Sequence, residues 1–120
     1  MKKVAILGAG FVTEPLARYL MDECAYNVVM ATRTPSKAEK IIGNRKNGTA
    51  VAWVAEQHDE LDELVQEVDL VVSMIPPTMH IPVAEACLRH RRHLVTTSYV
   101  SPEMQALDAE AKERGVLLMN

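Results

Sequence analysis

The feature that most constrains the fold is an apolar stretch at the start of the chain that runs directly into a pair of glycines. Residues 3–7 (Lys-Val-Ala-Ile-Leu) are typical of a buried strand, and Gly8 and Gly10 follow at once. The next residues have the apolar spacing of a helix. A strand, a glycine turn and a helix in this order suit a dinucleotide pyrophosphate, because the backbone can approach the phosphates and the helix offers free N–H groups. The alternative is a turn that uses its glycines for geometry alone and binds no ligand.

The third position of the pattern G-x-G-x-x-G is occupied by Thr13. A glycine at this position normally lets the helix pack closely on the strand, so we expect a small displacement of the helix. Pro15 belongs in a first helical turn, where its missing N–H is not needed, and this places the helix start near Val12. The departure weakens the motif without excluding it.

The length and composition indicate one domain over residues 1–120. With 48% hydrophobic residues and a net charge of −3, the chain can bury roughly two thirds of its unfolded surface in a core. No apolar run approaches the ~20 residues of a membrane span, and we expect a cytoplasmic protein. Cys24 and Cys87 lack the spacing of a metal or redox motif, so we interpret both as buried or half-buried apolar residues and predict no metal site.

The charge pattern argues against a nucleic-acid partner. The chain is mildly acidic, and its one dense basic group is residues 89–93 (Arg-His-Arg-Arg-His). Cations interact favourably with the dipole at a helix C-terminus, so we expect this group to cap a helix.

Short apolar runs alternate with amphipathic stretches along the whole chain, which is typical of a parallel sheet covered by helices. The pattern predicts strands at Lys3–Leu7, Asn27–Thr32, Ala50–Val54, Leu70–Met74, His93–Thr96 and Val116–Met119, and helices at Val12–Glu23, Ser36–Ile42, Asp59–Glu67, Ile81–Arg89 and Pro102–Arg114. Right-handed crossovers then predict a doubly wound parallel α/β sheet of the Rossmann type, with six strands in the order 3-2-1-4-5-6. The ligand crevice lies at the edge where the strands end.

Residues typical of helix ends support three of these boundaries. Thr34 and Ser101 each precede a proline, so we expect their hydroxyls to cap the helices that begin there. Gly115 is expected to end the last helix, because a glycine readily adopts the left-handed conformation found just after a helix.

The loop after the second strand predicts which dinucleotide binds. An NAD site usually has an acidic residue here, which binds the ribose hydroxyls. This chain has Arg33 instead, with Thr32, Thr34, Ser36 and Lys37 around it. A guanidinium can bind a 2′-phosphate with two hydrogen bonds, so we prefer NADP to NAD. The alternative is that Arg33 and Lys37 are solvated charges beside a capped helix.

Two further loops are expected to face the same edge. Residues 72–80 follow the fourth strand, and their backbone would run beside the ribose and nicotinamide of an extended cofactor. His80 at the end of this loop is a candidate acid–base or substrate-binding group, or alternatively a surface or capping residue. Residues 96–102 follow the fifth strand and carry hydroxyls that could bind a carboxylate or only satisfy the loop backbone. Tyr99 is either a catalytic and substrate-binding group or a packing residue.

The sequence therefore predicts two sets of site residues. The cofactor-binding set is Gly8, Gly10, Phe11, Val12, Thr32, Arg33, Thr34, Ser73, Ile75 and Pro76. The substrate-facing set comprises Ser98 and Tyr99 as substrate-binding groups, with Tyr99 and His80 as catalytic groups.

Four sequence runs together resemble the cofactor domain of the saccharopine dehydrogenase family, in particular its glutamate-forming, NADP-linked members. They are Gly8-Ala9-Gly10-Phe11-Val12 with Pro15, residues 31–34 (Ala-Thr-Arg-Thr), residues 71–76 (Val-Val-Ser-Met-Ile-Pro) and, most specifically, residues 93–102 (His-Leu-Val-Thr-Thr-Ser-Tyr-Val-Ser-Pro). The resemblance spans the whole chain. It implies an NADP-dependent oxidoreductase in which hydride leaves the saccharopine C–N bond for NADP and the imine hydrolyses to glutamate and aminoadipate semialdehyde. NADPH reduces the imine in the reverse direction.

The sequence departs from the family in two respects. The family tends to have an acidic residue after the third strand, whereas residues 52–55 read Ala-Trp-Val-Ala, which puts a hydrogen bond to the adenine in doubt. The substrate domain of the family, which supplies much of the amino-acid pocket and the dimer contacts, is absent from residues 1–120. We therefore expect a cofactor module that is inactive alone and works on a small amino-acid substrate as part of a longer enzyme, a homodimer or an assembly with a separate substrate domain. The alternative is a non-catalytic NAD(P)-sensing module that acts through a protein partner.

Overall fold

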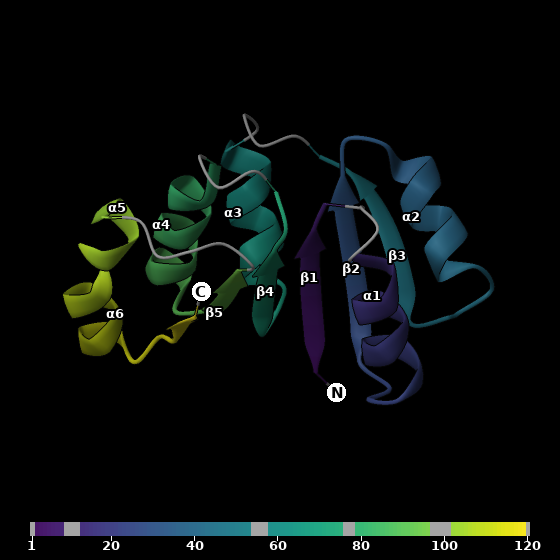
Figure 1. The fold of residues 1–120 in the computed structure, drawn as a ribbon, viewed down its shortest axis with the longest axis horizontal. Helices are drawn as coiled ribbons and strands as arrows, with labels where there is room; N and C mark the ends of the chain where they lie inside the picture. The colour runs from purple at the N-terminus through teal and green to yellow at the C-terminus, as the bar shows by residue number, and fades with distance from the viewer. Residues whose placement is uncertain (1, 9–12, 54–57, 76–78, 97–101, 120) are drawn as a thin grey trace.

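Six parallel strands form a single sheet in the order β3-β2-β1-β4-β5-β6 (Figure 1). The computed structural model describes residues 2–8, 13–53, 58–75, 79–96 and 102–119. The strands are β1 (Lys3–Leu7), β2 (Asn27–Thr32), β3 (Gly48–Ala52), β4 (Leu70–Ser73), β5 (His93–Thr96) and β6 (Leu118–Met119), and the helices are α1 (Thr13–Asp22), α2 (Pro35–Ile42), α3 (His58–Gln66), α4 (His80–His90), α5 (Pro102–Gln105) and α6 (Asp108–Arg114). The predicted doubly wound α/β fold and strand order are confirmed.

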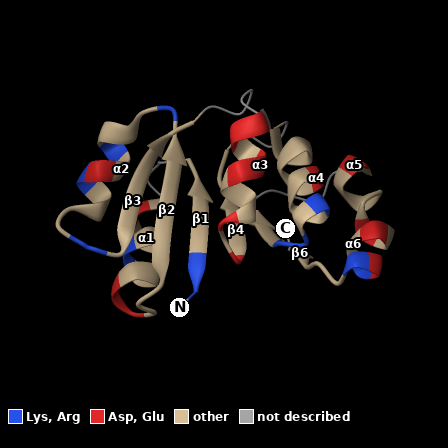
Figure 2. Ribbon diagram, turned by 180° about the vertical axis from the view of Figure 1, so that it is seen from behind, with Lys and Arg blue, Asp and Glu red and all other residues tan. Residues whose placement is uncertain are grey.

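The alternation of apolar residues in β1 explains why helices cover both faces of the sheet. Val4 and Ile6 point to one face and pack with α1 and α2, whereas Ala5 and Leu7 point to the other and pack with α3 and α4. A strand that is apolar on both sides can be stable only between two helical layers. Figures 1 and 2 show these layers from opposite sides, with α1 in front of the sheet in the first view and α3 and α4 in front in the second.

Three strands have the predicted bounds, and the main strand error is at the edge of the sheet. The third strand was predicted at Ala50–Val54, but β3 spans Gly48–Ala52 and is partly exposed along its length. An edge strand has no two-sided burial to mark its ends in the sequence. Its start is fixed instead by Asn47, whose side-chain amide donates hydrogen bonds to the carbonyls of Met21 and Tyr26. The strand predicted at Val116–Met119 is also shorter, because β6 contains only the last two of those residues.

The last predicted helix, Pro102–Arg114, is divided into α5 and α6. Leu107 lies between them, donates its N–H to the carbonyl of Met104 and packs its side chain against the apolar core. The N–H of Leu107 thus bonds three residues back instead of the four of an α-helix, and the helix is interrupted at a position where the sequence has no glycine or proline. Gly115 ends α6 in the left-handed conformation, as predicted, with a φ of +69°.

The basic group at residues 89–93 lies at the C-terminus of α4, as expected, and it also contacts α3. Arg89 and His90 lie in the last turn of α4 and contact Asp62 on α3, and the hydrogen bond from Arg89 is the main cause of the lowered pKa of the Asp62 carboxyl. Arg92 donates to the carbonyls of Val65 and Gln66 at the end of α3. The group therefore stabilises the packing of α3 against α4.

Replacing Gly48 by alanine is expected to lower the free energy of unfolding by about 1–3 kcal/mol, because the added methyl group would overpack the core. A Cβ at this position would lie 2.7 Å from Ile42 Cγ2 and 2.8 Å from Met21 Sδ. Urea unfolding measures the change, and Thr49→Ala at the exposed neighbouring position should change stability by no more than about 0.5 kcal/mol. Equal stability of the two variants would contradict the expectation.

Candidate functional site

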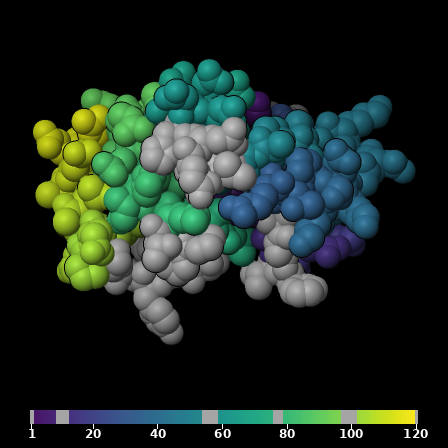
Figure 3. All heavy atoms as spheres, turned by 90° about the horizontal axis from the view of Figure 1, so that it is seen from above, coloured from purple at the N-terminus to yellow at the C-terminus, as the bar shows by residue number. Residues whose placement is uncertain are grey.

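At the carboxyl edge of the sheet, the connections that leave neighbouring central strands turn to opposite faces of the sheet. β1 lies between β2 and β4, and the helices that follow these strands cover opposite faces. In a doubly wound sheet this switch point leaves a crevice beside the ends of the central strands. The strands point upward in Figure 1, so Figure 3 looks down onto this edge.

Gly8 begins the turn at the end of β1 in a conformation that only glycine adopts readily. Its φ is +111°, and its N–H donates to the carbonyl of Ala31 on β2 over 2.8 Å. On the other side, a Cβ at this position would lie 3.3 Å from the carbonyl oxygen of Met74. The backbone is therefore held between the two neighbouring chain segments and exposes no side chain to the crevice, which is the geometry that close approach of a phosphate requires.

The buried polar side chains of the described residues all lie near this edge. They are Thr13, Thr32, Ser73, His80 and Thr96. Thr32, Ser73 and Thr96 are the last residues of their strands, and Thr13 and His80 are the first residues of α1 and α4. Burying polar groups is unfavourable unless they are hydrogen-bonded, and no buried side-chain N or O atom among the described residues lacks a partner. The polar interior is thus concentrated where the fold places a ligand.

The end of β2 and the loop after it contain a buried hydroxyl, on Thr32, and an exposed cation, Arg33. Thr32 is buried, and its Oγ1 accepts a hydrogen bond from the N–H of Thr34 over 3.3 Å. Arg33 is exposed and makes no hydrogen bond or ion pair with the residues that the structure describes. Thr34 occupies the N-cap position of α2, but its hydroxyl makes no capping hydrogen bond. The prediction of a hydroxyl cap at Thr34 is therefore wrong, because the N–H of Lys37 in the first turn donates to the backbone carbonyl of Thr34 over 3.1 Å instead of to its hydroxyl.

Basic and acidic residues occupy different parts of the carboxyl edge. Arg33 and Lys37 lie at the start of α2, whereas Asp59 and Glu60 lie in the first turn of α3. Figure 2 shows the blue segment between β2 and α2 and the red residues on α3. An anionic group would be attracted to the β2 side of this edge and repelled by the α3 side.

Ser73 and His80 form a buried pair across the connection between β4 and α4. The Oγ of Ser73 and the Nδ1 of His80 are 2.8 Å apart, and the exposed fractions of the two residues are 0% and 3%. Burial lowers the pKa of the His80 imidazole, because the charged ring would lose its hydration. Ile75 follows the strand and packs partly against the core. The predicted acid–base role of His80 and the cofactor contacts of Ser73 and Ile75 stay predictions.

Acidification is expected to weaken the fold through His80. Its pKa in the folded chain lies below the ordinary value of 6.5, so the unfolded chain takes up the proton first as the pH falls. The contribution of His80 to stability is complete above pH 6.5 and is lost as the pH falls toward its folded-state pKa. Urea unfolding at about pH 7.5 and 5.5 should show a larger loss for the unchanged protein than for His80→Asn, which cannot titrate there. Equal losses would contradict this assignment.

The other predicted site residues lie outside the described residues. They are Gly10, Phe11, Val12, Pro76, Ser98 and Tyr99, together with the expected cap Ser101. Their roles stay predictions.

Sequence reasoning missed the contacts of Met74 and the burial of Thr13. Thr13 was recognised only as a departure from the glycine pattern, but its side chain is buried and its Oγ1 donates to the Sδ of Met74 over 3.5 Å. The N–H of Met74 donates to the carbonyl of Leu7. Met74 thus contacts both the end of β1 and the start of α1. No sequence signal marks such a contact, because it joins residues 61 positions apart.

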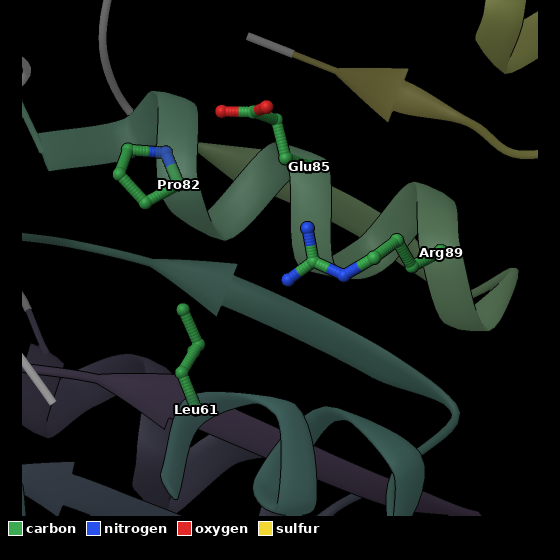
Figure 4. Close-up of a pocket in the computed structure, with 4 residues that line it drawn as sticks. All are labelled: Leu61, Pro82, Glu85 and Arg89. Atoms are coloured by element: carbon green, nitrogen blue, oxygen red, sulfur yellow. The ribbon is translucent and has the colours of Figure 1, made fainter. Parts of the chain in front are cut away.

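Two hollows lie away from the glycine turn. One of about 220 Å³ lies between α3 and α4, where Leu61, Pro82, Glu85 and Arg89 line it (Figure 4). The second, of about 330 Å³, is mainly apolar and lies near the strand starts, beside Tyr26, Leu70 and His93. Among the described residues that line them, neither hollow includes Gly8 or Arg33.

Cys87 is buried, and burial raises the pKa of its thiol to about 12, while Cys24 is half-buried, so both have the predicted environment.

Among the described residues, no three His, Cys, Asp or Glu side chains gather in a way that could hold a metal ion. None of the helices in the same residues combines the length and apolarity needed to span a bilayer.

The chain is similar over its full length to enzyme domains of known class. Residues 4–119 match the family described as saccharopine dehydrogenase NADP binding domain. The chain is 39% identical to saccharopine dehydrogenase (NADP+, L-glutamate-forming) of Schizosaccharomyces pombe, over 100% of the chain and 27% of that protein. It is 30% identical to mitochondrial alpha-aminoadipic semialdehyde synthase of Bos taurus, over 98% of the chain and 13% of that protein.

A solved structure gives the same result. Apo saccharopine dehydrogenase (L-Glu forming) from Saccharomyces cerevisiae superposes with a TM-score of 0.92 at 32% identity, covering 100% of this chain and 27% of that chain. The chain therefore spans about a quarter of the length of these fungal proteins.

Proposed function

Because the chain belongs to the family of saccharopine dehydrogenase NADP-binding domains, we propose that it is the cofactor-binding part of an oxidoreductase acting on the CH–NH group of an amino-acid-derived secondary amine. The substrate in this proposal is saccharopine, which is converted to glutamate and aminoadipate semialdehyde or formed from them. The observation that carries the proposal is the full-length likeness to glutamate-forming enzymes. The alternative of a sensing module without catalysis gains no support from these comparisons.

The described residues fit NADP at two points. Gly8 has no side chain beside the end of β1, so its backbone is open to a phosphate. Its positive φ and the 3.3 Å approach of an added Cβ to Met74 disfavour any other residue there. Arg33 is an exposed cation at the end of the neighbouring strand β2, where a 2′-phosphate would find a bidentate partner. NADP, when bound, supplies the hydride acceptor, and NADPH supplies the hydride donor.

The substrate-facing groups in this proposal come from the end of β5 and from parts of a longer enzyme. Thr96 ends β5 at the carboxyl edge of the sheet. Ser98 and Tyr99 come next in the sequence, and we assign them to binding the substrate carboxylate or placing its amine. A small-molecule amino-acid substrate is consistent with the names of the relatives. A homodimer or a separate substrate domain would complete the pocket. A cytoplasmic location stays a prediction, since the Bos taurus relative is described as mitochondrial.

The 120-residue chain is expected to bind NADPH without turning over saccharopine. One sheet edge provides the cofactor contacts, whereas catalysis requires further groups that orient the amine beside the cofactor. Fluorescence titration with NADPH measures binding, and absorbance at the NADPH band in the presence of saccharopine and NADP measures turnover. Failure of NADPH to bind would contradict the proposed function. Turnover by the chain alone would contradict the expected need for a further domain and would point to a pocket shared by two copies.

A further inference from the structure

We propose that Ser73 and His80 form a buried clasp that positions the wall of the cofactor crevice, with His80 as a positioning residue instead of a proton donor. The inference rests on the proposed function, because it assigns the clasp a role in binding NADP(H). It concerns the connection between β4 and α4, whose two ends these residues occupy.

The hydrogen bond between Ser73 and His80 spans the connection between β4 and α4. Ser73 is the last residue of β4 and His80 is the first residue of α4, and their hydrogen bond of 2.8 Å joins the two ends of the connection. Both side chains are buried. Two apolar residues would fill this space without the desolvation that polar groups undergo, so the polar pair contributes a directed contact in addition to packing.

Met74 connects the clasp to Gly8 at the end of β1. Met74 follows Ser73 directly, and its carbonyl oxygen lies where a Cβ on Gly8 would be only 3.3 Å away. Its N–H donates to the carbonyl of Leu7, and its Sδ accepts the hydroxyl of Thr13. Met74 therefore contacts both the end of β1 and the start of α1. Holding Ser73 in place also holds this contact.

The surroundings of the His80 ring determine whether it carries an extra proton. A ring that is 3% exposed and whose pKa is lowered by burial is neutral near pH 7, and its Nδ1 is already engaged by Ser73. These conditions favour a fixed neutral hydrogen bond and disfavour exchange of protons with a substrate.

The test compares NADPH affinity of four variants of the 120-residue chain. Ser73→Ala and His80→Leu remove the clasp, and each is expected to raise the Kd for NADPH at least fivefold. His80→Asn retains a side-chain amide close to the position of Nδ1, so its Kd should remain within about twofold of the unchanged value. Because either single change already removes the bond, the double variant Ser73→Ala/His80→Leu should bind no more weakly than the weaker single variant.

Cys87→Ala is the matched control, because Cys87 is buried on the same helix, α4, and its loss should reduce stability without changing the Kd. Titrations are made well below the melting temperature of each variant, so that a loss of stability alone does not change the measured Kd. If Ser73→Ala and His80→Leu melt earlier but bind NADPH as the unchanged protein does, the clasp is structural only and the inference is overturned. Failure of the unchanged protein to bind NADPH would instead contradict the proposed function, and the cofactor role of the clasp with it.

Hydrogen exchange of the segment 70–80 provides a second readout that needs no cofactor. Ser73→Ala and His80→Leu should accelerate amide exchange at Met74 and Ile75, whereas His80→Asn should not. Unchanged exchange in the first two variants would show that the pair does not hold this connection and would overturn the inference.

Discussion

Replacing Gly8 by valine is expected to lower NADPH affinity by ten- to a hundredfold. The native φ of +111° is strained for a β-branched residue, and the added side chain would press on the carbonyl of Met74. Such backbone strain has a free-energy cost of about 1–3 kcal/mol. If the turn rearranges to relieve the strain, NADPH binding must restore the original geometry, and a similar free energy is lost from binding. The same substitution should lower the free energy of unfolding.

Gly115→Val is the control for this effect. Gly115 also has a positive φ, +69°, but a Cβ there would meet no atom within 4 Å, and the residue ends α6 instead of facing the crevice. Valine at position 115 should therefore reduce stability while leaving the Kd for NADPH unchanged. Fluorescence titration and urea unfolding of both variants separate the two quantities. If both substitutions changed stability alone, Gly8 would be a turn residue without a ligand.

Removing the guanidinium of Arg33 is expected to abolish the preference for NADPH over NADH. A charge-assisted bidentate contact with the 2′-phosphate contributes about 1.5–3 kcal/mol, which corresponds to a ten- to hundredfold difference in affinity. Arg33 is exposed and engaged by none of the described side chains, so Arg33→Ala should change stability little. The Kd for NADPH should rise to the value for NADH, while the Kd for NADH stays nearly constant.

Lys40→Ala removes the same charge from the last turn of α2 and should preserve the preference, because Lys40 lies at the end of the helix remote from Arg33. Titrations at low and moderate salt should show the preference weakening as the phosphate contact is screened. Equal affinities of the unchanged protein for the two cofactors would disprove the role of Arg33.

The prediction of the strand order succeeded because two-sided apolar strands allow few arrangements. Residues such as Val4 and Ala5 alternate between two apolar faces, and strands of this kind must lie between two layers of helices. Right-handed crossovers then restrict the order of strands and place every strand end on one edge. Gly8 and Arg33 were therefore assigned to the same edge from the sequence, and they directly follow the ends of β1 and β2 there.

Local chemistry at that edge was predicted less well, because it depends on contacts between distant segments. The sequence marked His80 as an ionisable group at the end of the loop after the fourth strand, but burial and the hydrogen bond to Ser73 decide its environment. It marked the hydroxyl of Thr34 as a cap, but the N–H of Lys37 bonds to the backbone carbonyl of Thr34 and the hydroxyl makes no capping bond.

The sequence alone thus determined the layered sheet, its strand order and the edge to which Gly8 and Arg33 belong, because periodicity and handedness act along the chain and are visible in it. The tertiary structure decided where the edge strand β3 begins, why the last helix divides at Leu107 and which groups touch Gly8. Each of these depends on a partner far away in the sequence, such as Met74 for Thr13 or Asn47 for Met21. Such contacts arise from packing in three dimensions, and no pattern of neighbouring residues encodes them.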